Sequence, residues 1–350
     1  LPPVGCGPDS GDVPQLEGGR PQFPIGITNE NPRNTSDAGL AGLATRAAET
    51  VDMVNLFAHI RWNALSGSPP LTGHEPILRV GRHLGALQVP RMLTFDFTHD
   101  SVEGLGDINP MPDGSPVGRL DDPGVADAYL DELMALTEAL QPRIVSVGIE
   151  TDFFWLAHPD QWPAFREVLC TAHDQLHSSH PGIHVTTYFT LGTLVGRDGS
   201  LRSDGVNAFR QLLPCVDSVG YSDYWADGTH HLDDIPDGYF TAAASVAPDL
   251  PLIVPEFGYR GGDAVYSEQE QEAYLRRALS ELGEHDVMAA VLYSLYDQTY
   301  LGAPPFFKDA FSTIGLLRLD GTPKRSFVML RTTHQAGRHR RPLSLPPGTP

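Results

Sequence analysis

Short runs of β-branched and apolar residues alternate with amphipathic segments along most of this chain, and this alternation limits the possible folds more than any other feature. Eight strand-type runs occur, at 23–28, 51–58, 90–97, 144–148, 183–189, 216–221, 252–255 and 288–293. Strands separated by helices pair in parallel, because a parallel pair needs a long crossover connection. The sequence therefore predicts a succession of parallel βα units.

The segments between these runs carry signals for the start of a helix. Asp122-Pro123 combines an N-cap residue with a proline in the first helical turn. Ser267 and Glu270 have the spacing of a capping box. A last helical segment surrounds residues 326–331.

Eight strands in this alternation favour a closed barrel over an open sheet. An open doubly wound sheet usually has a glycine-rich phosphate turn after its first strand, and residues 28–32 contain no glycine. We predict an α/β protein with a single (β/α)₈ TIM barrel at 23–332. Residues 1–22 are expected to be a flexible N-terminal leader or linker, and 333–350 a disordered C-terminal tail, because neither segment shows periodicity.

The formal net charge of −20 narrows the range of partners. An acidic surface repels phosphate backbones, so no nucleic acid is expected, whereas a neutral glycan is compatible with it. No run approaches the ~20 apolar residues of a membrane span, and a monomer is expected. The opening Leu-Pro-Pro-Val-Gly-Cys faintly resembles a lipoprotein cleavage site. We therefore expect a secreted or cell-surface protein.

The three cysteines do not make a disulfide scaffold. Cys6 lies in the leader, Cys170 in a helical pattern and Cys215 just before a strand. Two buried thiols and one exposed thiol are the favoured interpretation, and a bridge between Cys170 and Cys215 is the alternative.

Polar and aromatic residues collect where the predicted strands end. In TIM barrels the chemistry takes place at this carboxyl end of the strands. Glu150 and Glu256 each directly follow a strongly apolar strand, the fourth and the seventh. Burial there disfavours the charged form and can create a general acid. The candidate substrate-binding residues at these ends are His59, Arg61, Trp62, Asp96, His99, Asp152, Trp155, Tyr188, Tyr224, Trp225, Tyr293 and Asp297.

Each of these groups also has an interpretation without catalysis. A single glutamate can simply form an ion pair with an arginine such as Arg61 or Arg260. His59, His99 and Asp96 can be combined into a metal site, but no His-x-His pair follows the first strand. We therefore predict no metal and no cofactor, with the histidines bonding substrate hydroxyls or the catalytic carboxylates.

The motifs Val147-Gly148-Ile149-Glu150, 219–225 (Val-Gly-Tyr-Ser-Asp-Tyr-Trp) and 254–258 (Val-Pro-Glu-Phe-Gly) resemble the fourth, sixth and seventh strands of glycoside hydrolase clan A. The closing segments 314–317 and 320–324 are similar to the end of many such barrels. The sixth-strand motif resembles family 53 endo-β-1,4-galactanases in particular. The resemblance covers essentially the whole predicted barrel.

The resemblance implies a retaining, double-displacement hydrolysis of β-glycosidic bonds in a poly- or oligosaccharide. Glu256 matches the nucleophile and Glu150 the acid/base, with carboxyl groups ~5–5.5 Å apart. Tyr221 matches the residue that bonds the nucleophile, and Arg61 is a further candidate partner of Glu256. Aromatic residues spread over several loops favour a groove and endo action.

Two positions depart from the clan. The asparagine that usually precedes the acid/base and bonds the sugar 2-hydroxyl is here Ile149, and the tryptophan that often ends the eighth strand is replaced in the segment 293–297. Asp96 or His99 can take over that bond, or the substrate is modified at its 2-position. Two alternative functions stay open, namely a carbohydrate-binding barrel without activity and a barrel hydrolase of another class.

Overall fold

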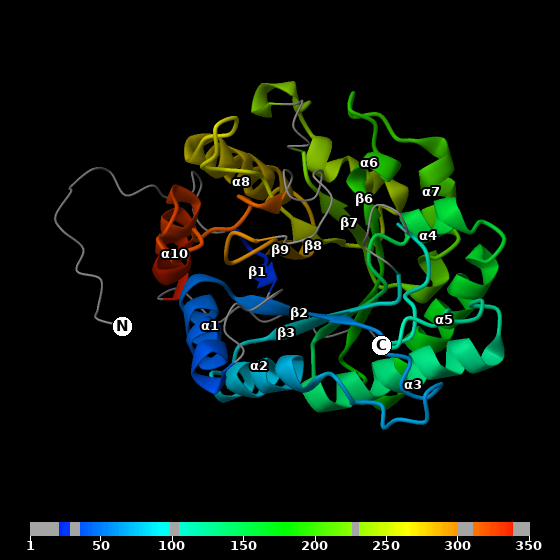
Figure 1. The fold of residues 1–350 in the computed structure, drawn as a ribbon. Coiled ribbons are helices and arrows are strands. Elements are labelled where there is room, and N and C mark those ends of the chain that lie inside the picture. The colour runs from blue at the N-terminus through cyan, green and yellow to red at the C-terminus, as the bar shows by residue number, and fades with distance from the viewer. Residues whose placement is uncertain (1–20, 29–35, 99–104, 226–230, 300–310, 339–350) are drawn as a thin grey trace.

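The computed structural model describes residues 21–28, 36–98, 105–225, 231–299 and 311–338. One parallel sheet of nine strands, in the order β5-β4-β3-β2-β1-β9-β8-β7-β6, forms its centre, and the helices surround it (Figure 1). The strands are β1 (Ile25–Thr28), β2 (Met53–His59), β3 (Arg91–Asp96), β4 (Ile144–Val147), β5 (His184–Thr186), β6 (Tyr188–Thr190), β7 (Val219–Asp223), β8 (Leu252–Phe257) and β9 (Val287–Leu292).

The two ends of the sheet are neighbours in the chain, because only Thr187 separates β5 from β6. β5 pairs with β4 on one side, and β6 pairs with β7 on the other. The two short strands are therefore the halves of one barrel strand, the predicted run at 183–189. The sheet closes into an eight-stranded barrel, which confirms the predicted fold class.

The helices lie in the connections between strands, as the alternation predicted. They are α1 (Asp37–Thr50), α2 (Glu75–Ala86), α3 (Pro123–Leu140), α4 (Asp152–Ala157), α5 (Trp162–Ser179), α6 (Leu191–Leu194), α7 (Ser203–Arg210), α8 (Glu268–Leu282) and α10 (Arg325–Arg338). Three 3₁₀ segments join them: η1 (Leu213–Cys215), η2 (Leu232–Asp234) and η3 (Tyr239–Val246).

Two predicted helix starts are confirmed at the level of individual hydrogen bonds. The Asp122 carboxylate accepts the N–H of Gly124 at 2.9 Å at the start of α3. At the start of α8 the Ser267 hydroxyl accepts the N–H of Glu270 at 3.1 Å, and the Glu270 carboxylate accepts the N–H of Ser267 at 2.8 Å. Both caps satisfy backbone donors that a first helical turn leaves unpaired.

The predicted end of the barrel at residue 332 is wrong. Helix α10 continues to Arg338 because its second half still packs against the barrel. Thr333 and His334 are buried, and His334 Nδ1 lies 3.2 Å from the Asp52 carboxylate. This packing outweighs the low helix propensity of Thr332, Thr333 and Gly337. The remainder of the predicted tail, and residues 1–20 of the predicted leader, lie outside the described residues.

The interior of the barrel is filled near the amino ends of its strands. Six buried residues form an apolar cluster there: Met53, Met92, Ile144, Ile253, Ala289 and Val291. Further along the strands the interior becomes polar, and the Thr94 hydroxyl donates to the Asn55 side chain at 3.0 Å. Reactive groups can therefore lie only at the open carboxyl end of the strands. Within the described residues no helix has the length and hydrophobicity to cross a membrane.

Candidate active site

Glu150 lies just beyond the end of β4, in a backbone turn that few residues adopt. Gly148 has a φ of 84° and Glu150 itself a φ of 40°, in the left-handed region that disfavours residues with a Cβ. The turn is held by the Thr151 N–H, which donates to the Tyr188 carbonyl at 2.9 Å. Such strained positions are concentrated at functional sites.

Glu256 lies within β8 and is only 4% exposed. The Tyr188 hydroxyl, at the start of β6, donates to Glu256 Oε2 at 3.3 Å. Ser222 of β7 is the direct neighbour of Glu256 across the sheet. Its hydroxyl donates to Glu150 Oε1 at 2.5 Å, so Ser222 connects the positions of the two glutamates.

Burial and neighbouring carboxyl groups determine the electrostatic environment of Glu150. The pKa of Glu150 is raised to about 8, mainly because burial disfavours the charged carboxylate and also because Asp152 and Asp96 add negative charge. The hydrogen bond from Ser222 opposes this shift. Glu150 is therefore predominantly protonated at neutral pH and able to donate a proton.

Three tyrosines line the same region. Burial raises the pKa of Tyr188 and of Tyr224, and the charges of Glu256 and Glu150 raise both further, so both phenols lie close to both glutamates. The ring of Tyr224 meets that of Tyr293 edge to face, with centroids 5.9 Å apart. The ring of Phe311 also meets that of Tyr224 edge to face, with ring centroids 4.9 Å apart. Phe311 follows no predicted strand, so no sequence pattern indicated it.

Asp96 ends β3 in the floor of this region and is fully buried. Its Oδ1 accepts both the N–H and the hydroxyl of Thr98, at 3.1 and 3.0 Å. His59 Nδ1 lies 3.4 Å from Asp96 Oδ2, and His59 is 35% exposed. Burial raises the pKa of Asp96. His59 and Asp96, both predicted to bind substrate, thus lie side by side, while His99 lies outside the described residues.

Tyr221 is not a partner of Glu256, and that prediction is wrong. Its hydroxyl donates to the Phe240 carbonyl of η3 at 2.5 Å, outside the barrel. Side chains alternate between the two faces of a strand, so Ser222 points inward and Tyr221 points outward. Tyr188 makes the contact with Glu256 instead.

Arg61 also departs from its predicted role. Its side chain is exposed, and its backbone N–H donates to the Glu132 carboxylate of α3 at 2.6 Å. The same carboxylate accepts the N–H of Asn63 at 3.1 Å and lies 2.7 Å from His74 Nε2. The stretch around Arg61 is thus anchored to α3 through the backbone, which directs the guanidinium toward solvent.

Trp62 and Trp225, two of the three tryptophans predicted to bind substrate, are too buried to stack on a sugar. Trp62 is completely buried and donates through Nε1 to the Asn109 carbonyl at 2.7 Å. Trp225 is 4% exposed and donates to the His231 carbonyl at 3.0 Å. Trp155 is half-buried on α4, with its ring stacked on Phe189. These indoles mainly fill the space beneath the loops.

Asp152 and Asp297 also have structural partners. Asp152 accepts the N–H of Thr190 at 3.0 Å and the hydroxyls of Thr190 and Thr193 at 2.7 and 2.6 Å. Asp297 accepts a bond from the ammonium group of buried Lys324 at 2.6 Å. Burial raises the pKa of each aspartate to about 6. Asp152 acts on the site indirectly, through its negative charge near Glu150.

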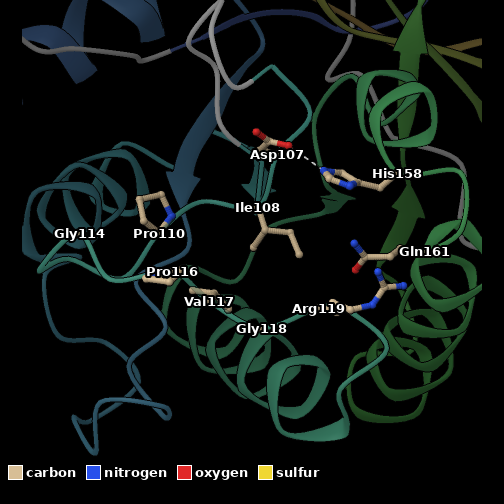
Figure 2. A pocket seen from close by; sticks show the side chains of 10 residues that line it. All are labelled: Asp107, Ile108, Pro110, Gly114, Pro116, Val117, Gly118, Arg119, His158 and Gln161. Atoms are coloured by element: carbon tan, nitrogen blue, oxygen red, sulfur yellow. Dashed lines mark hydrogen bonds and ion pairs between the residues drawn. The ribbon is translucent and has the colours of Figure 1, made fainter.

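A cavity of about 410 Å³ opens beside this region, between the β3–α3 connection and the turn from α4 to α5 (Figure 2). His158 Nε2 and Asp107 Oδ1 lie 2.7 Å apart at its edge. Arg119 pairs with Asp160 at 2.8 Å. The cavity follows β3 and β4 and therefore lies at the same end of the barrel as Glu150, although it contains neither glutamate. Most of the lining residues belong to the proline- and glycine-rich loop at 107–119, where no sequence pattern indicated a site.

Comparisons with known proteins extend the description of the fold. No protein family matches the sequence, and no curated protein matches it either. An exo-β-1,4-mannosidase from Opitutaceae bacterium strain TAV5 matches with a TM-score of 0.66 and 17% identity, over 96% of this chain and 63% of its own. GH5_18 from Streptomyces cattleya in complex with GlcNAc has a TM-score of 0.69 and 16% identity, over 93% and 82%.

A family 39 glycoside hydrolase from the gut symbiont Bacteroides cellulosilyticus WH2 matches with a TM-score of 0.60 and 16% identity, over 90% of this chain and 63% of its own. This chain thus spans less than two thirds of the mannosidase and of the family 39 protein. At these identities the likeness concerns the barrel fold, which many enzymes share.

Proposed function

We propose that this protein is a retaining glycoside hydrolase that cleaves β-glycosidic bonds, with Glu150 as acid/base and Glu256 as nucleophile. The observation that carries the proposal is the placement of two glutamates at the ends of β4 and β8, connected by Ser222. A double displacement needs one carboxyl group that is protonated and one that is ionised, close to each other.

The environments of the two glutamates suit these roles. The raised pKa of Glu150, about 8, keeps a proton available for the departing glycosidic oxygen. Glu256 accepts a hydrogen bond from Tyr188, which orients it and favours its charged form. In the first step Glu256 attacks the anomeric carbon while Glu150 protonates the leaving group. In the second step water attacks the anomeric carbon while the ionised Glu150 takes its proton, and the bond between the sugar and Glu256 breaks, which releases the sugar and restores both carboxyl groups.

The sugar binds against the residues around the two glutamates. Tyr224 and Tyr293 offer aromatic surface, and aromatic side chains provide contact area at low entropic cost. Asp96 and His59 lie on the side of β3 and β2, where they can bond the sugar 2-hydroxyl that Ile149 has no means of bonding. The finer proposal of endo action and the resemblance to family 53 rest on the sequence alone.

The first substrates to test follow from the similar structures. The mannosidase is named for β-1,4-mannosides, and one GH5_18 structure contains Manβ1-4GlcNAc. We therefore expect hydrolysis of a β-1,4-linked mannoside, and the panel also includes β-1,4-galactan and β-glucans. Products are followed by mass spectrometry and by NMR of the anomeric proton, with wild type and Glu256→Ala.

A β-configured product that appears first, and that is absent with Glu256→Ala, supports the proposal. Product of inverted configuration contradicts the double displacement. Binding of the glycans without hydrolysis anywhere in the panel favours the alternative of a non-catalytic carbohydrate-binding barrel. Activity that is lost on chelation and restored by a metal favours a barrel hydrolase of another class.

A further inference from the structure

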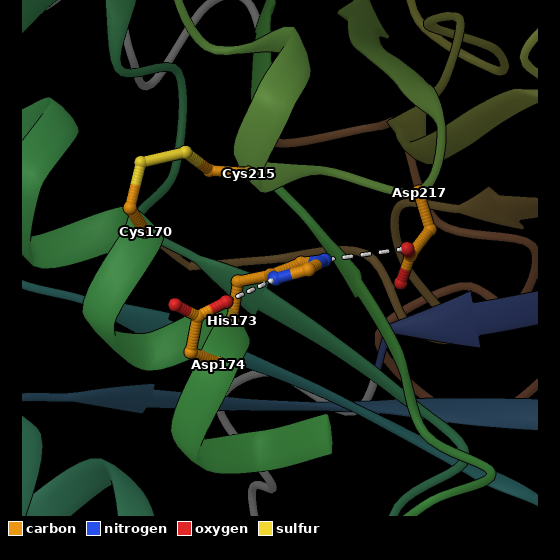
Figure 3. The surroundings of a disulfide bond; sticks show 5 residues. All are labelled: Cys170, His173, Asp174, Cys215 and Asp217. Atoms are coloured by element: carbon orange, nitrogen blue, oxygen red, sulfur yellow. Dashed lines mark hydrogen bonds and ion pairs between the residues drawn. A yellow bond between two sulfur atoms is a disulfide. The ribbon is translucent and has the colours of Figure 1, made fainter. Parts of the chain in front are cut away.

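A second cluster of polar side chains lies at the opposite end of the barrel from the glutamates. His173 and His177 are on the last turns of α5, which leads into the start of β5. Asp217 lies just before the start of β7. Figure 3 shows the His173 ring directed at Asp217 across the gap between the two segments. Among the described residues, these three form the one group with the composition and spacing of a metal site.

The distances suit the coordination of one ion. His177 Nε2 is 3.0 Å from Asp217 Oδ2, and His173 Nε2 is 3.5 Å from Asp217 Oδ1. The two rings are 4.4 Å apart, as expected for histidines four residues apart on one helix face. Ligands bound to Zn²⁺ at 2.0–2.1 Å in tetrahedral geometry are about 3.3 Å apart. Only small rotations of the side chains are needed to enclose an ion.

Further contacts orient the three side chains. His173 Nδ1 lies 3.1 Å from the Asp174 carboxylate, so its other nitrogen, Nε2, is the one free for a metal. Metal-binding histidines commonly have such a carboxylate partner. The N–H of Val185 donates to Asp217 Oδ2 at 2.7 Å and fixes the carboxylate. The group is thus held in place from both segments.

A disulfide joins the same two segments. The structure forms the bridge between Cys170 and Cys215, with Cα atoms 4.6 Å apart, where buried thiols had been the favoured prediction (Figure 3). Cys170 is one helical turn before His173, and Cys215 is two residues before Asp217. The crosslink therefore limits how far the histidines and the aspartate can separate, which lowers the entropy lost on binding an ion.

His184, at the start of β5, supports the same interpretation. Its Nε2 is buried and has no hydrogen-bond partner in the described structure. His184 lies close to Asp217 and His177, so a buried imidazole nitrogen without a hydrogen-bond partner borders the cluster.

We propose that His173, His177 and Asp217 bind one divalent transition-metal ion, Zn²⁺ in the first instance, and that this ion is structural. Two imidazoles and one carboxylate select Zn²⁺ over Mg²⁺ or Ca²⁺, which prefer oxygen ligands. Water completes the coordination, because the side chains are 21–35% exposed. The amino end of a TIM barrel serves stability and not catalysis. The proposal is independent of the proposed hydrolase activity.

The test uses the full chain without an affinity tag, stripped with EDTA and kept free of thiol reductants so that the disulfide stays formed. ZnCl₂ is titrated in by calorimetry, and thermal unfolding is recorded with and without zinc. We expect one Zn²⁺ per chain and a rise in Tm of about 4 °C at 100-fold excess over Kd. Co²⁺ is expected to show visible absorption bands at the same stoichiometry.

Two variants test the ligands. One is the double substitution His173→Gln and His177→Gln. The other is Asp217→Asn, whose amide oxygen can still accept the N–H of Val185. Both should lose at least about 100-fold in zinc affinity, and a cooperative thermal transition in EDTA shows that they fold. His180→Gln is the matched control on the same helix, since its partner is Glu138, and it should bind zinc like wild type. No zinc binding by wild type, or equal binding by the double variant, overturns the proposal. Loss of binding in Glu256→Ala also overturns it, because the ion would then lie at the other end.

Discussion

At the carboxyl end of the barrel, buried carboxyl groups lie beside other carboxyl groups, whereas at the amino end a carboxylate lies beside potential cations and donors. Glu150 is near Asp152 and Asp96, and its pKa is raised to about 8. Asp217 is near His173 and His177 and accepts the N–H of Val185. At the carboxyl end the neighbouring carboxyl groups thus favour the protonated form of Glu150. At the amino end Asp217 has nearby partners for its negative charge.

The difference shows how one barrel separates function from stability. Neighbouring like charges and a strained turn at Glu150 reduce the stability of the folded chain and are kept only where they serve chemistry. The disulfide and the paired groups at the amino end stabilise the elements on which the glutamates depend. Substitutions at the two ends should therefore change different observables.

The largest expected effect is on turnover by Glu150→Gln. Glutamine preserves the shape and can still accept the Ser222 hydrogen bond, but it has no proton to donate. We expect kcat on a disaccharide to fall about 10²–10⁴-fold. An aryl glycoside with a dinitrophenolate leaving group needs no protonation and should lose far less in its first step. Equal losses on both substrates, measured by steady-state and burst kinetics, argue against an acid role.

The next largest effect concerns the amino end. Replacing Cys170 and Cys215 by serine opens a crosslink between positions 45 residues apart. We expect the free energy of unfolding to fall by about 2–4 kcal/mol, with kcat unchanged at temperatures where the variant is folded. Denaturant titration and initial rates are the measurements. A large change in kcat would show that the two ends of the barrel are coupled.

The sequence predicted the barrel because the alternation of strands and helices is repeated eight times, and each repeat supports the same fold. It predicted Glu150 and Glu256 because a glutamate directly after an apolar strand has one available location, the open end of the barrel. Both predictions use only the order of residues along the chain. They do not require knowledge of side-chain direction.

The wrong predictions concern features that depend on side-chain direction and on tertiary packing. Tyr221 and Ser222 are adjacent and point to opposite faces of β7, and the pairing of β7 with β8 shifts register between Gly220 and Ser222. Trp62 has a φ of 55° that turns its indole into the core. The pairing of Cys170 with Cys215 depends on how α5 packs against η1. None of these features is visible in local sequence patterns.

A smaller effect distinguishes two tyrosines that the sequence could not. Tyr188→Phe removes the hydrogen bond to Glu256, and we expect kcat/KM to fall about 5–10-fold, the equivalent of about 1 kcal/mol. Tyr221→Phe removes the bond to the Phe240 carbonyl outside the barrel. It should lower stability by about 1 kcal/mol and leave kcat/KM as in wild type. Both variants are measured by kinetics and by denaturation. A loss of kcat/KM in Tyr221→Phe, with only a loss of stability in Tyr188→Phe, would support the role that the sequence predicted for Tyr221.

The smallest effects are shifts in pH dependence around Glu150. Activity should fall above about pH 8 as the acid loses its proton. Ser222→Ala removes a hydrogen bond that favours the charged form, so this limb should move to higher pH. Asp152→Asn removes a negative neighbour, so the limb should move to lower pH. Measuring kcat/KM against pH for both variants tests whether Glu150 is responsible for the alkaline limb. Shifts of this limb in the same direction would contradict that assignment.

The pH dependence of thermal stability tests the raised pKa of Glu150 independently of activity. The folded pKa of Glu150, about 8, lies above the value of about 4.3 for an exposed glutamate. The folded state therefore retains a proton that the unfolded state releases, and this contribution is complete below pH 4 and is lost as pH rises through 8. Glu150→Gln should unfold at a higher temperature than wild type at pH 8–9, with a smaller difference at pH 5. Equal pH dependence of Tm in the two proteins would place the alkaline limb on another residue.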